Sequence, residues 1–181
     1  MMAHLPRISV QPGQLHLARH PTILRTILGS CVSATFWSAR LGAGALCHGI
    51  LPRCPRGTDG ADGYRYVDFS IRYLAKQFDA LGVSRDELEV KLFGGADVLP
   101  VAAARLAKST VGALNCQAAW EVLEEQGLRV AASDLGGIRG RTIRFHTGTG
   151  EVLLQRLATL PKTVPCENDV APAQRNSQAQ L

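Results

Sequence analysis

Short runs of β-type pattern alternate with two helical segments along the chain. Residues 22–28 and 32–37 are rich in β-branched and apolar residues, and the Gly29-Ser30-Cys31 junction separates them. These runs predict two strands. A third apolar stretch, 41–51, ends at a proline and predicts another strand. Because the connection is short, we expect residues 32–37 to pair antiparallel with 43–48.

The later part of the chain predicts both main helices and the remaining strands. Apolar positions at helical spacing lie between an expected cap at Asp68 and Gly82, and a second helix is expected from about Asn115 to Glu125. Ser84 and Glu87 fit a capping box. Alternating patterns then predict strands, listed here as 88–92, 128–132, 142–146 and 151–157. This mixed order predicts a layered α+β or α/β fold.

The amino-acid composition bears on membrane insertion, on the state of the cysteines and on the charge of a partner. The 181 residues contain no apolar run near the roughly 20 residues of a membrane-spanning helix, so we expect a protein that is not membrane-inserted and is cytoplasmic. Five cysteines, an odd number without a CxxC pair, favour reduced thiols. The net charge of +5 favours an acidic partner surface.

Cys31 and His48 are the candidate chemical pair. A glycine beside Cys31 lets the backbone bend and leaves amide N–H groups free to point at a ligand. A nearby histidine can take a proton from a thiol, and the expected strand pairing would bring His48 close. The spacing alone leaves open that Cys31 is a small core residue and His48 an ordinary strand histidine.

Metal and nucleotide chemistry are not expected. Cys47, His48 and Cys54 lack a fourth zinc ligand, so no metal is predicted. The segment 136–141 lacks the Lys-Ser/Thr of a phosphate-binding loop. A nucleic-acid partner would rest on charge alone, and none is predicted.

Five motifs in register resemble the CheD family of chemoreceptor glutamine deamidases. They are Thr26-Ile27-Leu28-Gly29-Ser30-Cys31-Val32, His48-Gly49-Ile50-Leu51-Pro52, Tyr66-Val67-Asp68, Lys91-Leu92-Phe93-Gly94-Gly95-Ala96 and Asp134-Leu135-Gly136-Gly137-Ile138-Arg139-Gly140-Arg141. The resemblance runs from Leu15 to Leu157. It predicts a deamidase domain at 15–157, preceded by a flexible N-terminal segment at 1–14. Beyond Leu160 the chain is polar and too poor in apolar residues to repay ordering, so we expect a disordered tail at 158–181.

The resemblance implies both an activity and a site. It implies Cys31 as nucleophile, His48 as base and Thr26 as the residue that orients His48 or the substrate amide. Gly29 and Ser30 would supply backbone support for the oxyanion. Ammonia would leave as a Cys31 thioester forms, and no cofactor is implied. The implied fold is an α/β sandwich with mixed, largely antiparallel sheets and two main helices, similar to the catalytic domain of cytotoxic necrotizing factor toxins.

The implied partners are methyl-accepting chemotaxis receptors as substrate and a CheC-type phosphatase. Receptor surfaces of this kind are commonly acidic, which suggests docking through basic residues. The candidate docking residues are Arg139, Arg141, Arg144, Phe93, Gly94 and Gly95. One departure from the family pattern is Gly112-Ala113-Leu114-Asn115, where many relatives have Gly-x-Arg-Asn. A non-catalytic adaptor, a receptor methylesterase and a Cys–His protease remain alternatives.

Overall fold

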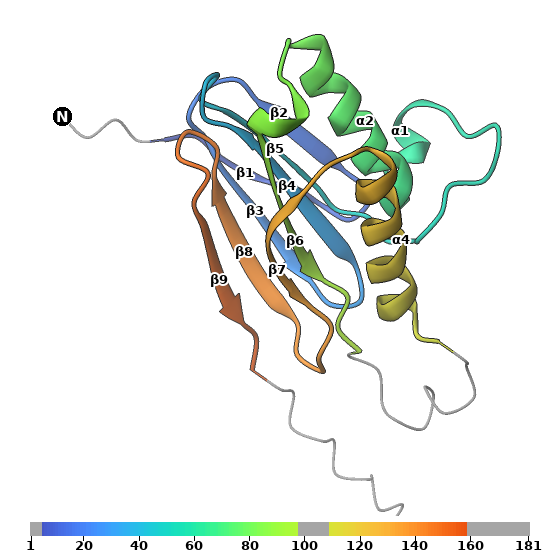
Figure 1. The fold of residues 1–181 in the computed structure, drawn as a ribbon. Coiled ribbons are helices and arrows are strands. Elements are labelled where there is room, and N and C mark those ends of the chain that lie inside the picture. Colours follow the sequence, from blue (N-terminus) through green and yellow to red (C-terminus); the bar gives the residue numbers. More distant parts are fainter. Residues whose placement is uncertain (1–4, 98–108, 159–181) are drawn as a thin grey trace, which may run out of the picture.

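The computed structural model describes residues 5–97 and 109–158, which form two β-sheets and a layer of helices (Figure 1). The four-stranded sheet has the order β1-β3-β8-β9. Its strands are β1 (Arg7–Ser9), β3 (Ile23–Leu28), β8 (Arg141–His146) and β9 (Val152–Arg156). The five-stranded sheet has the order β2-β5-β4-β6-β7. Its strands are β2 (Leu15–Ala18), β5 (Ala43–Cys47), β4 (Val32–Ser38), β6 (Leu88–Gly94) and β7 (Val130–Leu135).

The helices lie on one side of the molecule, against the five-stranded sheet (Figure 1). The main ones are α2 (Val67–Ala80) and α4 (Val111–Glu125), and the shorter ones are α1 (Gly60–Gly63) and the 3-10 turn η1 (Arg85–Glu87). Strand pairs β1–β3 and β6–β7 are parallel, and the other described pairs are antiparallel. The predicted α+β class, with two main helices and largely antiparallel sheets, is confirmed.

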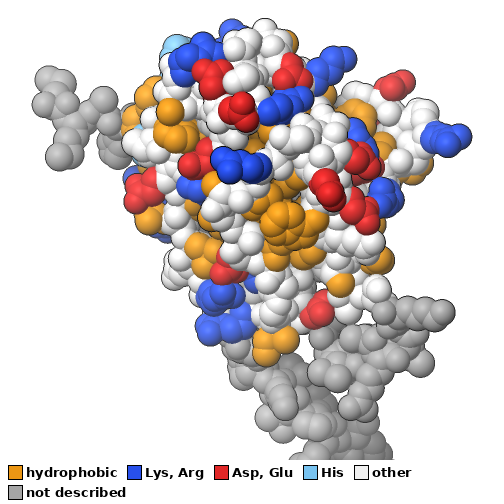
Figure 2. Space-filling view, in the orientation of Figure 1, with side chains coloured by type: hydrophobic (Ala, Val, Ile, Leu, Met, Phe, Trp, Pro, Cys, Tyr) orange, Lys and Arg blue, Asp and Glu red, His pale blue; other side chains and the backbone are white. Residues whose placement is uncertain are grey.

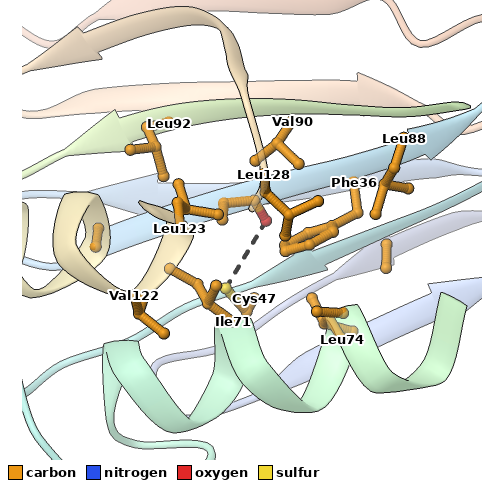
Figure 3. Close-up of a cluster of buried hydrophobic side chains, with 14 of the residues drawn as sticks. Phe36, Cys47, Ile71, Leu74, Leu88, Val90, Leu92, Val122, Leu123 and Leu128 are labelled. Atoms are coloured by element: carbon orange, nitrogen blue, oxygen red, sulfur yellow. Dashed lines mark hydrogen bonds between the residues drawn. The ribbon is translucent and has the colours of Figure 1, made fainter. Parts of the chain in front are cut away.

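Two hydrophobic clusters hold the three layers together. The larger one packs α2 and α4 on the five-stranded sheet, with Phe36, Cys47 and Ile71 among its buried members (Figure 3). The smaller one lies between the two sheets and includes Leu24, Leu46 and Phe145. Leu46 and Cys47 are neighbours on β5 that belong to different clusters. The alternation of side chains along a strand therefore sends successive residues into the two interfaces.

Helix starts differ from those that the sequence predicts. The N-cap of α2 is Tyr66, and Asp68 lies inside the helix, where its carboxylate accepts a 2.8 Å hydrogen bond from the Cys54 amide. Helix α4 begins at Val111, four positions earlier than expected, because the Thr110 hydroxyl caps the Ala113 amide. The predicted capping box of Ser84 and Glu87 is confirmed at η1.

The N-terminal segment 1–14 was expected to be flexible, and the structure contradicts this for residues 7–10. Arg7–Ser9 form β1, which pairs parallel with β3, and the Val10 side chain is buried between the sheets. Alternation over three residues is too short a pattern to predict a strand. The predicted tail falls almost entirely at residues 159–181, outside the described part. No helix within the described ranges is long and apolar enough to cross a membrane.

Candidate active site

Cys31 lies at the point where the chain passes from one sheet to the other. Strand β3 ends at Leu28 in the four-stranded sheet, and β4 begins at Val32 in the five-stranded sheet. The Cys31 side chain is half-buried and packs against the cluster between the sheets. The crossover turn 29–31 therefore presents the thiol at the edge of an apolar interface.

All three carbonyl groups of this turn are held by hydrogen bonds. The Gly29 carbonyl accepts from the Ala96 amide at 2.8 Å, and the Cys31 carbonyl accepts from the Gly95 amide at 2.8 Å. Between them, the Ser30 carbonyl accepts from the Asn115 side chain at 3.0 Å. Within the described residues the Ser30 amide has no acceptor. The turn thus fixes its carbonyls, and the Ser30 amide is available to a ligand. The oxyanion role of Gly29 and Ser30 stays a prediction.

The end of β6 is closely packed against this turn. Gly94 has a φ of 116°, and a Cβ atom built on it would lie 2.1 Å from the Cys31 carbonyl oxygen. A separation this small is far inside van der Waals contact, so only glycine fits. Gly94 at the end of β6 therefore allows the backbone to approach the Cys31 turn.

His48 follows β5 and faces the same interface as Cys31. Val32 and Gly49 exchange two backbone hydrogen bonds, of 3.0 and 2.9 Å, and continue the predicted antiparallel pairing. Cys31 and His48 flank that pair and are diagonal neighbours on one face. The Cα atoms of such neighbours are roughly 7–8 Å apart, a separation that an imidazole ring can span. The strand pairing that the sequence predicts is confirmed.

Thr26 connects His48 to the four-stranded sheet. Its hydroxyl donates a 2.8 Å hydrogen bond to the Val10 carbonyl and lies 2.7 Å from Nδ1 of His48. A hydroxyl has one proton, and a carbonyl can only accept, so Nδ1 must donate to Thr26. This assigns the proton of the neutral ring to Nδ1 and leaves a lone pair on Nε2. Nε2 is buried, and no described residue bonds to it.

Burial favours the uncharged form of both groups. It lowers the pKa of His48 below 6.5, although the Val10 carbonyl opposes this, and it raises the pKa of the Cys31 thiol above 9.0, against a hydrogen bond from its own amide. The resting pair is therefore a thiol and a neutral imidazole. Such an imidazole can accept a proton at neutral pH.

Asn115 is a site residue that the sequence reasoning did not assign. It is fully buried on α4, and its amide donates to the Ser30 carbonyl at 3.0 Å and to the Ile50 carbonyl at 2.9 Å. One side chain thereby fastens the segments that carry Cys31 and His48 to the helical layer. A lone asparagine in the apolar pattern of a helix was the available signal, because a buried amide needs partners.

Several of the candidate docking residues are buried, which contradicts a role on the surface. The side chain of Arg141 is inaccessible to solvent, forms an ion pair with Asp134 at 3.0 Å and donates to the Gly94 carbonyl at 2.8 Å. It therefore holds the end of β6. Phe93 packs between the sheets, and Gly94 and Gly95 are buried as well. Of the candidates, Arg139 and Arg144 are exposed.

A hollow of about 230 Å³ leads to the imidazole. Its walls include Gln11, Arg25, Thr26, Ile27 and His48. Cys31 is not one of its lining residues, so the hollow borders the base and its threonine. No group of three or more His, Cys, Asp or Glu side chains in the described ranges is arranged to hold a metal ion.

The fold and the site together define a class. It is a two-sheet sandwich with one helical layer, in which a threonine hydroxyl contacts an imidazole and a half-buried thiol lies at the crossover between the sheets. A family model described as CheD chemotactic sensory transduction matches residues 50–156, more than half of the chain. This chain belongs to the CheD family.

Curated relatives align over most of the chain. A protein of Geobacter sulfurreducens named probable chemoreceptor glutamine deamidase CheD 2 is 46% identical over 153 residues, which are 84% of this chain and 91% of the relative. Proteins named probable chemoreceptor glutamine deamidase CheD from Maridesulfovibrio salexigens and Pseudomonas fluorescens are 39% and 38% identical. These alignments cover 83% and 80% of this chain, and 92% and 81% of the relatives.

Proposed function

We propose that this chain is a protein-glutamine deamidase that converts glutamine side chains of methyl-accepting chemotaxis receptors to glutamate in the cytoplasm. The names of its relatives supply the substrate class. The observation that carries the proposal is the buried Nε2 of His48, to which no residue of 5–97 or 109–158 bonds and whose lone pair is fixed by the bond from Nδ1 to Thr26. A base held in this way beside a half-buried thiol suits acyl transfer.

The first step of the proposed reaction is the addition of Cys31 to the amide. His48 Nε2 takes the thiol proton as sulfur attacks the carboxamide carbon, and the carbonyl electrons move to oxygen. Because burial keeps the resting thiol neutral, this proton transfer accompanies the attack. The amide N–H groups of the turn that carries Gly29, Ser30 and Cys31 would stabilise the oxyanion.

The second step releases ammonia, and water then restores the enzyme. Imidazolium Nε2–H protonates the departing nitrogen, the carbon–nitrogen bond breaks and a thioester with Cys31 remains. Water, deprotonated by His48, attacks the thioester and frees the thiol. The product is a glutamate side chain, so each turnover adds one negative charge to the receptor and alters repulsion between its helices.

Peptide mass spectrometry of a receptor cytoplasmic domain incubated with the protein tests this function. We expect particular glutamines to gain the mass of an amide-to-acid conversion. Cys31→Ala and His48→Ala should abolish the conversion. Cys54→Ala should not, because it alters a half-buried cysteine that has no role in the proposed reaction. Receptor binding with every glutamine unchanged would select the adaptor instead, and methanol release from methylated receptor would select the methylesterase.

The family resemblance also makes a CheC-type phosphatase a proposed partner. A phosphatase that occupied the same face as the receptor would compete with it. Addition of such a phosphatase should then slow receptor deamidation, and an unchanged rate at saturating phosphatase would argue against this partner.

A further inference from the structure

The outer face of the four-stranded sheet is open to solvent in the described part of the chain. Its inner face packs on the five-stranded sheet, and the helices lie beyond that second sheet (Figure 1). On the outer face, Ile27 is 51% exposed and Leu153 is 58% exposed. An antiparallel sheet can face water on one side, but large exposed apolar side chains among charges are typical of interaction surfaces.

Three arginines, Arg7, Arg25 and Arg144, lie on this face, which we call the arginine face. Arg25 on β3 is directly opposite Arg144 on β8, and Arg7 on β1 is opposite Ile23 on β3. The inward neighbours of Arg25 and Arg144 along their strands are buried, so alternation places all three arginines on the outside. They come from three adjacent strands.

The arginine face differs from other basic parts of the described molecule in its ion pairing. None of its three arginines forms an ion pair with a described carboxylate. Around α2, in contrast, Arg72 pairs with Asp68 and Glu125, and Figure 2 shows basic and acidic side chains intermingled at the top of the view, where α2 lies. Like charges directly opposite each other in a sheet destabilise it, so a partner that neutralises Arg25 and Arg144 is favoured.

The arginine face leads to the candidate active site. A hollow of about 550 Å³ on this face is lined by Arg7, Arg25 and Arg144 together with Ile23 and Leu153, and by Glu151, the acidic side chain in its wall. Arg25 also lines the smaller hollow that ends at Thr26 and His48. The two hollows share Ser9 as well. A protein bound over the larger hollow would therefore extend to the edge of the catalytic pair.

We propose that the arginine face is the docking surface for an acidic helix of the substrate protein, an inference that rests on the proposed function. Neighbouring strands are about 4.8 Å apart. Side chains at i and i+4 on a helix are about 5–6 Å apart, so two carboxylates one turn apart match Arg25 and Arg144. A helix laid across the strands would place its third acidic position over β1, near Arg7. Ile27 and Leu153 would bury its apolar positions.

Steady-state deamidation of the receptor cytoplasmic domain by the full chain tests this docking. The double variant Arg7→Glu/Arg144→Glu should raise KM about tenfold and leave kcat within about twofold, because two contacts are lost and repulsion is added far from the reacting atoms. Its KM should also lose most of its dependence on ionic strength. Arg129→Glu is the matched control, because Arg129 is exposed without an ion pair and lies just before β7 in the other sheet.

Binding measured without turnover separates this inference from the proposed function. In a Cys31→Ala background, we expect the double variant to weaken the Kd for the receptor domain about tenfold, as it does KM. If no variant converts glutamine and the arginine variant still weakens binding, the function fails and the docking surface stands. An unchanged Kd and KM in a correctly folded double variant would overturn the docking surface. The docking surface would also be overturned if the double variant lost binding to phosphatidylserine vesicles but kept its binding to the receptor domain.

Discussion

Replacement of Thr26 by valine tests the claim that one hydroxyl fixes the catalytic tautomer. Valine has the shape of threonine but can neither donate to the Val10 carbonyl nor accept from His48 Nδ1. Both groups would remain buried without a partner. An unsatisfied buried group costs about 1–3 kcal/mol, and the added methyl group returns about 1 kcal/mol. We therefore expect the free energy of unfolding to fall by about 1–5 kcal/mol.

The same substitution should slow the reaction through the imidazole. Without Thr26 the proton on Nδ1 loses its acceptor, and the tautomer with the proton on Nε2, which cannot act as a base, becomes populated. One lost hydrogen bond of about 1–1.5 kcal/mol corresponds to about a tenfold fall in kcat/KM. The fall should appear in kcat, because Thr26 acts through His48.

The assay is receptor deamidation followed by mass spectrometry, together with urea unfolding of the same preparations. Thr26→Ser is the matched control, because it keeps the hydroxyl and removes only a methyl group. Serine should retain most of kcat and most of the stability. A valine variant with unaltered kcat/KM would refute the tautomer argument, and so would a serine variant as impaired as the valine variant.

Two further changes test the turn and the base. Gly94→Ala should unfold the protein or abolish deamidation, because its Cβ would lie 2.1 Å from the Cys31 carbonyl oxygen. Gly42→Ala is the control: Gly42 has a φ of 57° and no atom within 4 Å, so this change should lower the free energy of urea unfolding by only about 1–2 kcal/mol. Equal effects of the two changes would contradict the packing argument. Burial lowers the pKa of His48, so below pH 6.5 the unfolded chain binds a proton that the native chain does not. The free energy of unfolding should therefore fall as pH drops from 6.5 through the lowered pKa, less so in His48→Gln, and an equal fall in both proteins would count against a neutral buried imidazole.

Local patterns predicted most of the secondary structure and the strand pairing between Cys31 and His48. The strand pairing that brings His48 towards Cys31 follows from a short connection between two β-type runs, and the structure has that pairing. The motif resemblance supplied Thr26, and the structure explains its position through the bond to His48. Short patterns are sufficient when the residues concerned are close in the sequence.

Contacts between distant segments were beyond such reasoning. Arg141 looked like a surface arginine because three arginines follow a glycine pair, yet Asp134 and backbone carbonyls compensate its burial. Asn115 reaches carbonyls on two other segments, and no spacing in the sequence indicates such partners. Strand β1 acquires its structure from β3 by parallel pairing and has too few residues to show a pattern of its own.

The hydrogen bonds of Asn115 mean that the candidate site draws on every layer of the protein. Thr26 belongs to the four-stranded sheet, Cys31 and His48 adjoin the five-stranded sheet, and Asn115 belongs to a helix. A partly folded chain without the four-stranded sheet lacks the Thr26 hydroxyl that orients the base. One without the helical layer lacks the Asn115 bond that holds the turn of Cys31. Newly made or damaged copies that are incompletely folded should therefore not deamidate glutamines of other proteins. Deamidase activity then reports that all three layers have folded.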